Sequence, residues 1–299
     1  MRPLHQERPR TRPAAERSRV DITLDRVLPV VEARIGRVLP APAARFVCEF
    51  LAFGIKQAWA CLFGGLLLAM ILATGAWPDA APLARYDFLF FFALAVQAAF
   101  LATRLERLDE ATVILLFHVV GTAMEVFKTA AGSWIYPDTN FFRIGGVPMF
   151  SGFMYAAVGS YLSRVVRIHE FEFSRYPPRR WTLLLAAAIY VNFFTHHFAP
   201  DVRVALLLAA VVLFWGVSVS FRVWRRRFRM PLLLGFFLVA FFIWIAENVG
   251  TAAGAWMYPE QRAGWRLVSL RKLDAWYLLM LISWTLVTVV HAPRVERRR

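Results

Sequence analysis

Cysteine is scarce in this chain, which has only two cysteines among 299 residues. Cys48 and Cys61 lie 13 residues apart and match neither a Cys-x-x-Cys pair nor a Cys/His metal spacing. If one helix carried both, they would stand about 20 Å apart, too far for a disulfide bond. We therefore predict two free thiols that pack as small apolar residues.

The short motifs of several large enzyme classes are also absent. The sequence has no P-loop and no dinucleotide-binding fingerprint, and Ser151 is not flanked as a nucleophile elbow. No apolar stretch follows the N-terminus closely enough to form a signal peptide. The sequence thus indicates none of the P-loop, dinucleotide-binding or serine-hydrolase enzymes.

Apolar residues, by contrast, are abundant. They make up 59% of the chain, and the mean hydropathy is +0.51. A bilayer core about 30 Å thick needs roughly 20 apolar residues per helix. Runs near that length lie at residues 58–76, 86–102, 110–127, 147–166, 181–198, 201–221, 231–250 and 274–292. The sequence therefore predicts an all-α integral membrane protein with about eight transmembrane helices.

One 13-residue pattern occurs twice, at residues 125–137 and 247–259. Both copies read E-x-x-x-T-A-A-G-x-W-x-Y-P, at an offset of 122 residues. The same offset carries the first four apolar runs onto the last four within a few residues, except that the sixth run begins early. Four spans return a chain to its starting side, so we predict two parallel four-helix repeats. The predicted regions are a basic extension (1–45), a first repeat (46–170) and a second repeat (171–299).

The basic residues set the predicted orientation. With the N-terminus in the cytoplasm, 27 of the 35 Lys and Arg residues lie on cytoplasmic loops and tails. This asymmetry predicts that both termini are cytoplasmic. The net charge of +15 then indicates binding to anionic lipid headgroups on the cytoplasmic side. Nucleic-acid binding is not expected, because the arginines lie next to the membrane.

The N-terminal extension is rich in Arg and Pro. Disorder is expected for residues 1–20. Between Val20 and Leu39, aliphatic residues alternate with charged ones, which predicts a helix that lies on the membrane surface.

Two carboxylates are notable because charge is costly inside an apolar run. Glu125 closes the third run and Glu247 closes the seventh, both near the outer face, where an ordinary interfacial glutamate is the alternative. Parallel repeats would let both face one cavity at the same depth. Lys128, three residues after Glu125, predicts that Glu125 is ionised. Glu247 is followed by Asn248 and has no cation nearby, so it is predicted to be protonated and to act as an acid.

Histidines gather at the same predicted depth. The fifth run ends with Asn192, His196 and His197, and His118 shares a helix face with Glu125. Three roles are open: acid–base or hydrogen-bonding chemistry, a divalent metal site, and a structural interface. The metal and any cofactor stay unassigned, because the spacing matches no recognised metal motif.

Each motif copy places a Trp and a Tyr two residues apart. An aromatic belt at the membrane interface would explain them, and an aromatic wall around a ligand is the alternative. The candidate substrate-binding residues are Asn192, Trp134, Tyr136, Tyr155, Asn248, Trp256, Tyr258 and His118.

Several segments together resemble the domain-of-unknown-function 817 family of bacterial multi-pass membrane proteins. They are residues 56–59 (K-Q-A-W), 85–87 (R-Y-D), 125–137, 146–155, 192–198, 229–231 (R-M-P) and 244–250. The resemblance covers roughly residues 46–292 and implies the inner membrane of a bacterium. It supplies no substrate, cofactor or catalytic residue.

A shorter match concerns chemistry. The order Glu, G-x-W-x-Y, G-V-P is similar to that in membrane-bound carotenoid hydratases and small-subunit lycopene cyclases, whose acidic residues are implicated in protonating a double bond. The paired acidic motif of the cyclases is absent here. We therefore hypothesise a membrane enzyme or binding protein for an isoprenoid- or lipid-like substrate. Glu247 would be the acid and Glu125 its charge-stabilising partner, with His196, His197 and Asn192 orienting them. A small-solute or proton-coupled transporter and a non-catalytic membrane scaffold are the alternatives.

Overall fold

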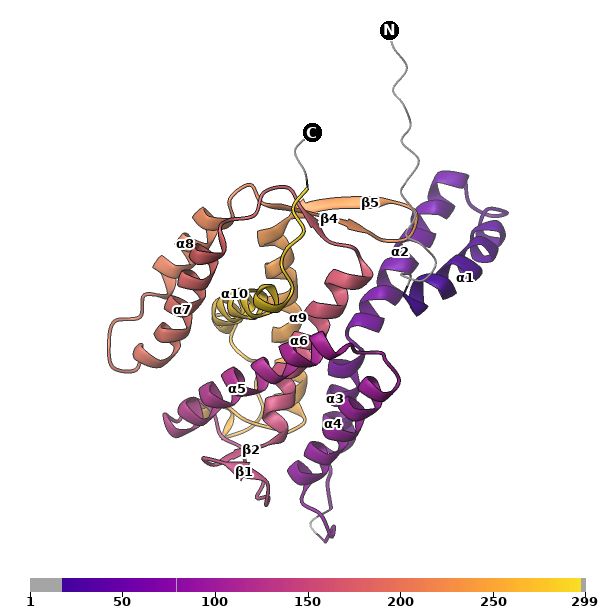
Figure 1. Ribbon diagram of the computed structural model, residues 1–299. Coiled ribbons are helices and arrows are strands. Elements are labelled where there is room, and N and C mark those ends of the chain that lie inside the picture. Colours follow the sequence, from indigo (N-terminus) through magenta and orange to yellow (C-terminus); the bar gives the residue numbers. More distant parts are fainter. Residues whose placement is uncertain (1–17, 79, 297–299) are drawn as a thin grey trace.

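The structure is a computed structural model that describes residues 18–78 and 80–296 (Figure 1). This part of the chain is mostly helical, as predicted, and a helix overlaps each of the eight apolar runs. The α-helices are α1 (Arg19–Ile35), α2 (Ala41–Ala60), α3 (Leu62–Ala73), α4 (Arg85–Ala102), α5 (Leu108–Ala130), α6 (Phe150–Ile168), α7 (Arg179–Thr195), α8 (Arg203–Phe214), α9 (Leu232–Ala252) and α10 (Lys272–Val290).

Four helices, α4, α5, α9 and α10, are long and apolar enough to cross a membrane. A fifth span results if α2 and α3 count as one, although they meet at a 70° bend next to Cys61. The predicted run at 58–76 missed this bend, because the run begins inside α2. The length and apolar composition of these helices indicate a membrane protein.

Short strands interrupt the helices, which corrects the prediction of an all-α chain. They are β1 (Arg143–Ile144), β2 (Val147–Pro148), β3 (Glu172–Phe173), β4 (Ser218–Arg222) and β5 (Arg227–Pro231). The sixth apolar run, 201–221, is therefore not one helix. Helix α8 ends at Phe214, Gly216 turns the chain with a φ of 74°, and Val219 and Phe221 then alternate with serines in strand β4. Strands β3, β4 and β5 form an antiparallel sheet in that order.

Helix α1 forms within the segment predicted to be helical, and it packs on α2 and on the β4–β5 turn. An ion pair of 2.7 Å joins Asp21 to Lys56 of α2. Burial would raise the pKa of Asp21, but the charge of Lys56 holds that pKa below its usual value. Glu49 of α2 accepts backbone N–H groups of the β4–β5 turn, from residues 224 to 226. The extension is thus docked from Arg19 onward, and residues 1–17 lie outside the described part of the chain.

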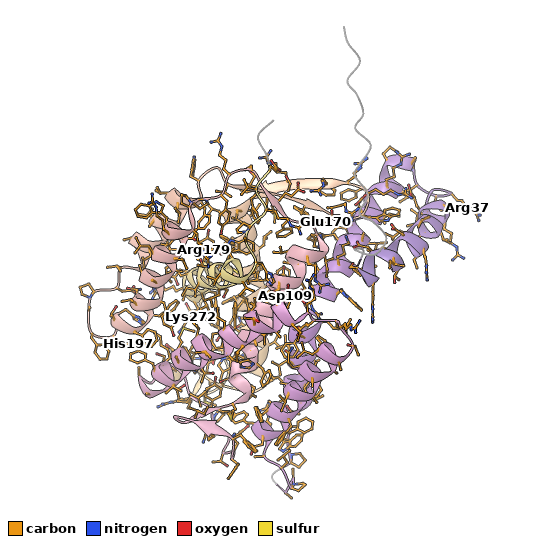
Figure 2. The ribbon with its side chains drawn as sticks, in the orientation of Figure 1. Arg37, Asp109, Glu170, Arg179, His197 and Lys272 are labelled. Atoms are coloured by element: carbon orange, nitrogen blue, oxygen red, sulfur yellow. The ribbon has the colours of Figure 1, made fainter. Side chains whose placement is uncertain are left out.

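The connecting loops gather at two opposite ends of the molecule, with α1 and the β4–β5 hairpin at one end and β1 and β2 at the other (Figure 1). At the first end, Arg222 pairs with Glu170 at 2.6 Å, and residues 294–296 pair with β3. Glu170 is labelled at this end in Figure 2. At the second end, Arg85 at the start of α4 donates to the backbone oxygen of Ala253 at 2.8 Å. Loops that are remote in sequence therefore close each end of the bundle.

Candidate functional site

The first motif copy folds into a clasp around Glu125. The carboxylate lies in the last turns of α5, and only 3% of the residue is exposed. Oε2 accepts hydrogen bonds from Trp134 Nε1 at 2.9 Å and from the Tyr136 hydroxyl at 2.8 Å. Oε1 accepts one from the Tyr155 hydroxyl of α6 at 2.7 Å. Three neutral donors thus hold both oxygens of this carboxylate.

The second copy builds the same clasp around Glu247 of α9, with one donor fewer. Oε1 accepts hydrogen bonds from Trp256 Nε1 at 3.1 Å and from the Tyr258 hydroxyl. Oε2 is buried and has no hydrogen-bond partner among the described residues. Tyr277, which matches Tyr155 in the offset of 122, packs beside the apolar core instead. The two glutamates therefore differ in one carboxylate oxygen, because Oε2 of Glu247 is buried without a hydrogen-bond partner in the described chain and both oxygens of Glu125 have one.

The two clasps touch each other. Ile135 and Met257, at equivalent motif positions, form an antiparallel bridge, and the rings of Trp134 and Tyr258 meet edge to face at 6.2 Å. The Tyr86 hydroxyl donates to the backbone oxygen of Ala255 at 3.0 Å. The R-Y-D segment at the start of α4 thus fastens the second loop beside the first.

The tyrosines of the two clasps are poised to donate. Burial, and then the negative charge of Glu125, raise the pKa of Tyr136 well above its usual value. Burial and the charge of Glu247 act in the same direction on the pKa of Tyr258. Both hydroxyls therefore keep their protons at neutral pH, so each can serve as a hydrogen-bond donor to its glutamate.

A cavity of about 1280 Å³ opens from the two clasps into the bundle. Four helical stripes line it at spacings of three or four residues, from α2 and α3, α6, α9 and α10. The stripe of α9 runs from Leu232 through Phe236 and Val239 to Glu247. Along that stripe the cavity is about 22 Å long, from fifteen residues at about 1.5 Å each. The volume exceeds the roughly 300–1,000 Å³ of usual ligand pockets, so the cavity has room for a lipid-sized molecule.

The predicted ionic neighbours of the glutamates are wrong. Lys128 turns away from Glu125, and its Nζ lies 3.3 Å from His196 Nε2 and 3.1 Å from His197 Nε2. Glu247, which was predicted to have no cation nearby, has Lys272 of α10 beside its clasp, with Nζ 4.2 Å from the centre of the Tyr258 ring. Spacing along α5 suggested that Lys128 pairs with Glu125, but the cation beside one of these glutamates is Lys272, which comes from another helix and lies beside Glu247.

The other predicted site residues separate into two groups. Trp134, Tyr136, Tyr155, Trp256, Tyr258 and His196 line the cavity with the two glutamates. His197, Asn192, Asn248 and His118 do not line it. Asn192 binds Asp201 at 3.0 Å, Asn248 binds the backbone of Trp244 and Val268, and the His118 ring packs against Phe153 at 4.4 Å. These four residues support loops and helix contacts.

Metal ligation was one of the open roles for the histidines. Within residues 18–78 and 80–296, no three side chains of His, Cys, Asp or Glu converge as metal ligands would. The His196 and His197 rings lie 4.2 Å apart and share Lys128 between them. The geometry around these histidines is that of a hydrogen-bonded cation.

The basic residues at this end of the cavity were not predicted from the sequence. Lys272, Arg271 and Arg203 line it together with Lys128. Figure 2 labels His197 beside the end of α7 and Lys272 nearer to the centre of the bundle. The available signal was the scarcity of lysine, since Lys56, Lys128 and Lys272 are the lysines of a chain with 35 basic residues.

Comparison with known proteins identifies relatives across most of the chain. Residues 49–284 match the family described as "Protein of unknown function (DUF817)". The chain is 44% identical over 243 residues to the protein named "Uncharacterized protein YoaT" of Bacillus subtilis (strain 168), covering 81% of this chain and 92% of that protein. No solved structure matches the chain.

Proposed function

The chain belongs to the family described as protein of unknown function DUF817, and we propose that it is a membrane-embedded enzyme for an isoprenoid- or lipid-like substrate. The observation that carries this proposal is the buried, unpartnered Oε2 of Glu247, a residue that lines the end of a long and mostly apolar cavity. An apolar molecule would fill the cavity between α3, α6, α9 and α10. Its end would then lie against the two clasps.

The clasp geometry suits proton transfer by Glu247. Oε2 is buried and has no hydrogen-bond partner among the described residues, so it can hold a proton and exchange it with a substrate atom that reaches it. When the proton leaves, the carboxylate keeps the hydrogen bonds of Trp256 and Tyr258 on Oε1, which stabilise its charge. Glu125, held by three donors, would stay ionised and stabilise positive charge that develops on the substrate.

We further propose that the eight apolar segments cross the membrane as two parallel four-span units, with both termini in the cytoplasm of a bacterium. Support comes from the contacts between loops. The segments predicted to be cytoplasmic contact one another through two ion pairs, Arg167 with Glu110 and Arg227 with Glu170. The predicted outer segments also touch, through Ile135 and Met257. The exposed arginines of the β4–β5 turn would bind anionic lipid headgroups.

Proton-coupled transport, the main alternative, fits the cavity less well. A proton or ion path needs polar groups or water along its length. Between Glu247 and Leu232, the residues that α9 presents to the cavity are apolar, including Phe236 and Val239. That stripe suits an apolar chain better than an ion. A non-catalytic scaffold, the other alternative, would not need a buried carboxylate oxygen without a hydrogen-bond partner.

Deuterium transfer to carbon tests the proposed chemistry directly. Purified protein would be incubated in D₂O in nanodiscs made from bacterial lipid extract, and carbon-bound deuterium in the lipids measured by mass spectrometry. Wild-type protein should introduce carbon-bound deuterium into one lipid class. Glu247→Gln should not, because the side-chain amide cannot act as a proton donor or acceptor in place of the carboxyl group. Glu172→Gln, at the opposite end of the molecule, is the matched control and should label like wild type. Equal labelling by Glu247→Gln, or none by wild type, would disprove proton transfer.

A further inference from the structure

Lys128 and Lys272, the two lysines at the end of the cavity, are not repeated in the other half of the chain. At the offset of 122 residues, Gly250 matches Lys128 and Phe150 matches Lys272. Each lysine is therefore peculiar to its own half of the chain, yet the two line the same end of one cavity. The third lysine of the chain, Lys56, is neutralised by Asp21. The pairing of Lys128 and Lys272 calls for a reason other than the repeat.

Lys128 is a buried cation without a carboxylate partner. Only 5% of the residue is exposed, and Nζ contacts His196 and His197. In the part of the chain that the structure describes, no carboxylate oxygen lies within 4.0 Å of the Lys128 Nζ. Burying an unpaired charge is costly, whereas burying a paired one is much less so. A neutral imidazole nitrogen accepts a hydrogen bond but does not balance the charge.

Lys272 is half-buried and also lacks a direct carboxylate contact within the described residues. Its Nζ lies above the Tyr258 ring, and among residues 18–78 and 80–296 it too lacks an ion pair within 4.0 Å. Arg203, beside it, is already neutralised by Asp201 and Asp274 at 2.8 and 3.2 Å. Glu247 and Glu260 attract Lys272 through space without a contact within 4.0 Å, whereas the positive charges of Lys272 and Arg203 repel Lys128.

The two glutamates do not supply that contact. Both oxygens of Glu125 and Oε1 of Glu247 point to the Trp and Tyr donors of their clasps. Oε2 of Glu247 forms no hydrogen bond to a described residue, so it forms none to Lys272. This end of the cavity thus presents two ammonium groups with free donor capacity.

We propose that the ligand of this cavity carries an anionic headgroup, a phosphate or a carboxylate, that binds to Lys128 and Lys272 while its apolar chain fills the cavity. This inference rests on the proposed function and names its substrate class. Ammonium groups recognise such anions through charge-assisted hydrogen bonds, which are stronger in an apolar surrounding than in water. Because Glu247 lies at the same end, the reacting carbon belongs to the part of the chain next to the headgroup.

Three probes separate the headgroup from the chain: n-hexadecyl phosphate, n-hexadecanol and inorganic phosphate. Binding to detergent-purified protein can be followed by tryptophan fluorescence, since Trp134, Trp256 and Trp276 line the cavity. Hexadecyl phosphate should bind at least about tenfold more tightly than hexadecanol, equal to about 1.4 kcal/mol. Inorganic phosphate should bind far more weakly than either, and equal binding would indicate a site for free phosphate and overturn the lipid headgroup.

Substitution of the lysines assigns the headgroup site. Lys128→Met and Lys272→Met should each weaken hexadecyl phosphate binding about tenfold and leave hexadecanol binding unchanged. Arg229→Met removes one exposed charge at the opposite end and is the matched control, with no change expected. If the lysine variants do not fold, the salt dependence of binding to the wild type decides. Between about 50 and about 500 mM salt, the affinity for hexadecyl phosphate should fall and that for hexadecanol should not.

The outcomes also separate this inference from the proposed function. If hexadecanol binds as tightly as hexadecyl phosphate, or if the lysine variants behave like Arg229→Met, the anionic headgroup is wrong while the apolar cavity still takes a chain. If neither long-chain probe binds, the cavity is not a lipid site, and the proposed function fails with the inference.

Discussion

Ile135 and Met257 exchange both of their backbone hydrogen bonds. Ile135 N donates to Met257 O at 2.9 Å, and Met257 N donates to Ile135 O at 3.0 Å. The two residues hold the same place in the two copies of the motif, between its Trp and its Tyr. A pair of bonds between equivalent residues is the contact that a local two-fold relation produces. It brings the tryptophan–tyrosine pairs of the two clasps together.

The two glutamates should respond differently to the same substitution. Glu125→Gln places an amide NH₂ opposite a Trp or Tyr donor, whichever way the amide is turned, because both oxygens accept hydrogen bonds. In Glu247→Gln, the NH₂ can take the place of the open Oε2. We expect Glu125→Gln to cost about 1–3 kcal/mol of stability and Glu247→Gln much less. Thermal unfolding in detergent measures both, and equal losses would contradict the difference in hydrogen bonding.

Gly250 should not tolerate a methyl group. A Cβ at this position would lie 2.1 Å from the Trp256 ring, which donates to Glu247. We expect Gly250→Ala to cost about 1–3 kcal/mol and to move the indole from Glu247. Gly65→Ala is the matched control, because a Cβ there would meet no atom of another part of the chain within 4 Å. Intrinsic tryptophan emission and unfolding temperature report the two effects, and identical behaviour of the two variants would refute the close contact.

Stability should fall in mildly acidic solution because of His169. Its Nδ1 lies 3.0 Å from the backbone oxygen of Arg222, and burial followed by the charge of Lys56 lowers the pKa of His169 to about 4. In the unfolded chain this pKa is about 6.5. Between these two values the unfolded chain binds a proton that the folded protein does not. His169 therefore leaves the stability unchanged above pH 6.5 and lowers it as the pH falls from 6.5 toward 4.

The comparison that checks this prediction is the difference between wild type and His169→Gln, since other groups titrate equally in both. Unfolding temperatures at pH 7.5 and pH 5 should differ more in the wild type than in the variant. Equal shifts in the two proteins would show that His169 does not carry the pH dependence.

The proposed topology predicts which surfaces a membrane-impermeant thiol reagent can reach. Single cysteines would be placed at exposed positions in a chain whose Cys48 and Cys61 are replaced by alanine. Thr139→Cys and Arg262→Cys should react in intact cells. Arg175→Cys and Arg226→Cys should react only after the cells are opened. Labelling of either of the last two in intact cells would break the parallel arrangement of the halves.

The sequence alone determined the helices and the paired motif. Apolar run length and helical period are local properties, so the runs located α4, α5, α9 and α10 closely. The duplicated motif identified Glu125 and Glu247 together with their aromatic neighbours, because each Trp and Tyr lies within eleven residues of its glutamate.

Tertiary structure decided which charges meet. Spacing along α5 put Lys128 near Glu125, but the ammonium group turned to His196, 68 residues away, and Lys272 came to Tyr258 from α10. The strand at residues 218–222 likewise depends on its pairing with β3 and β5. Local spacing fixes which residues share a face of a helix. Which neighbour that face meets depends on packing between segments remote in sequence, and a buried charge takes the partner that packing supplies.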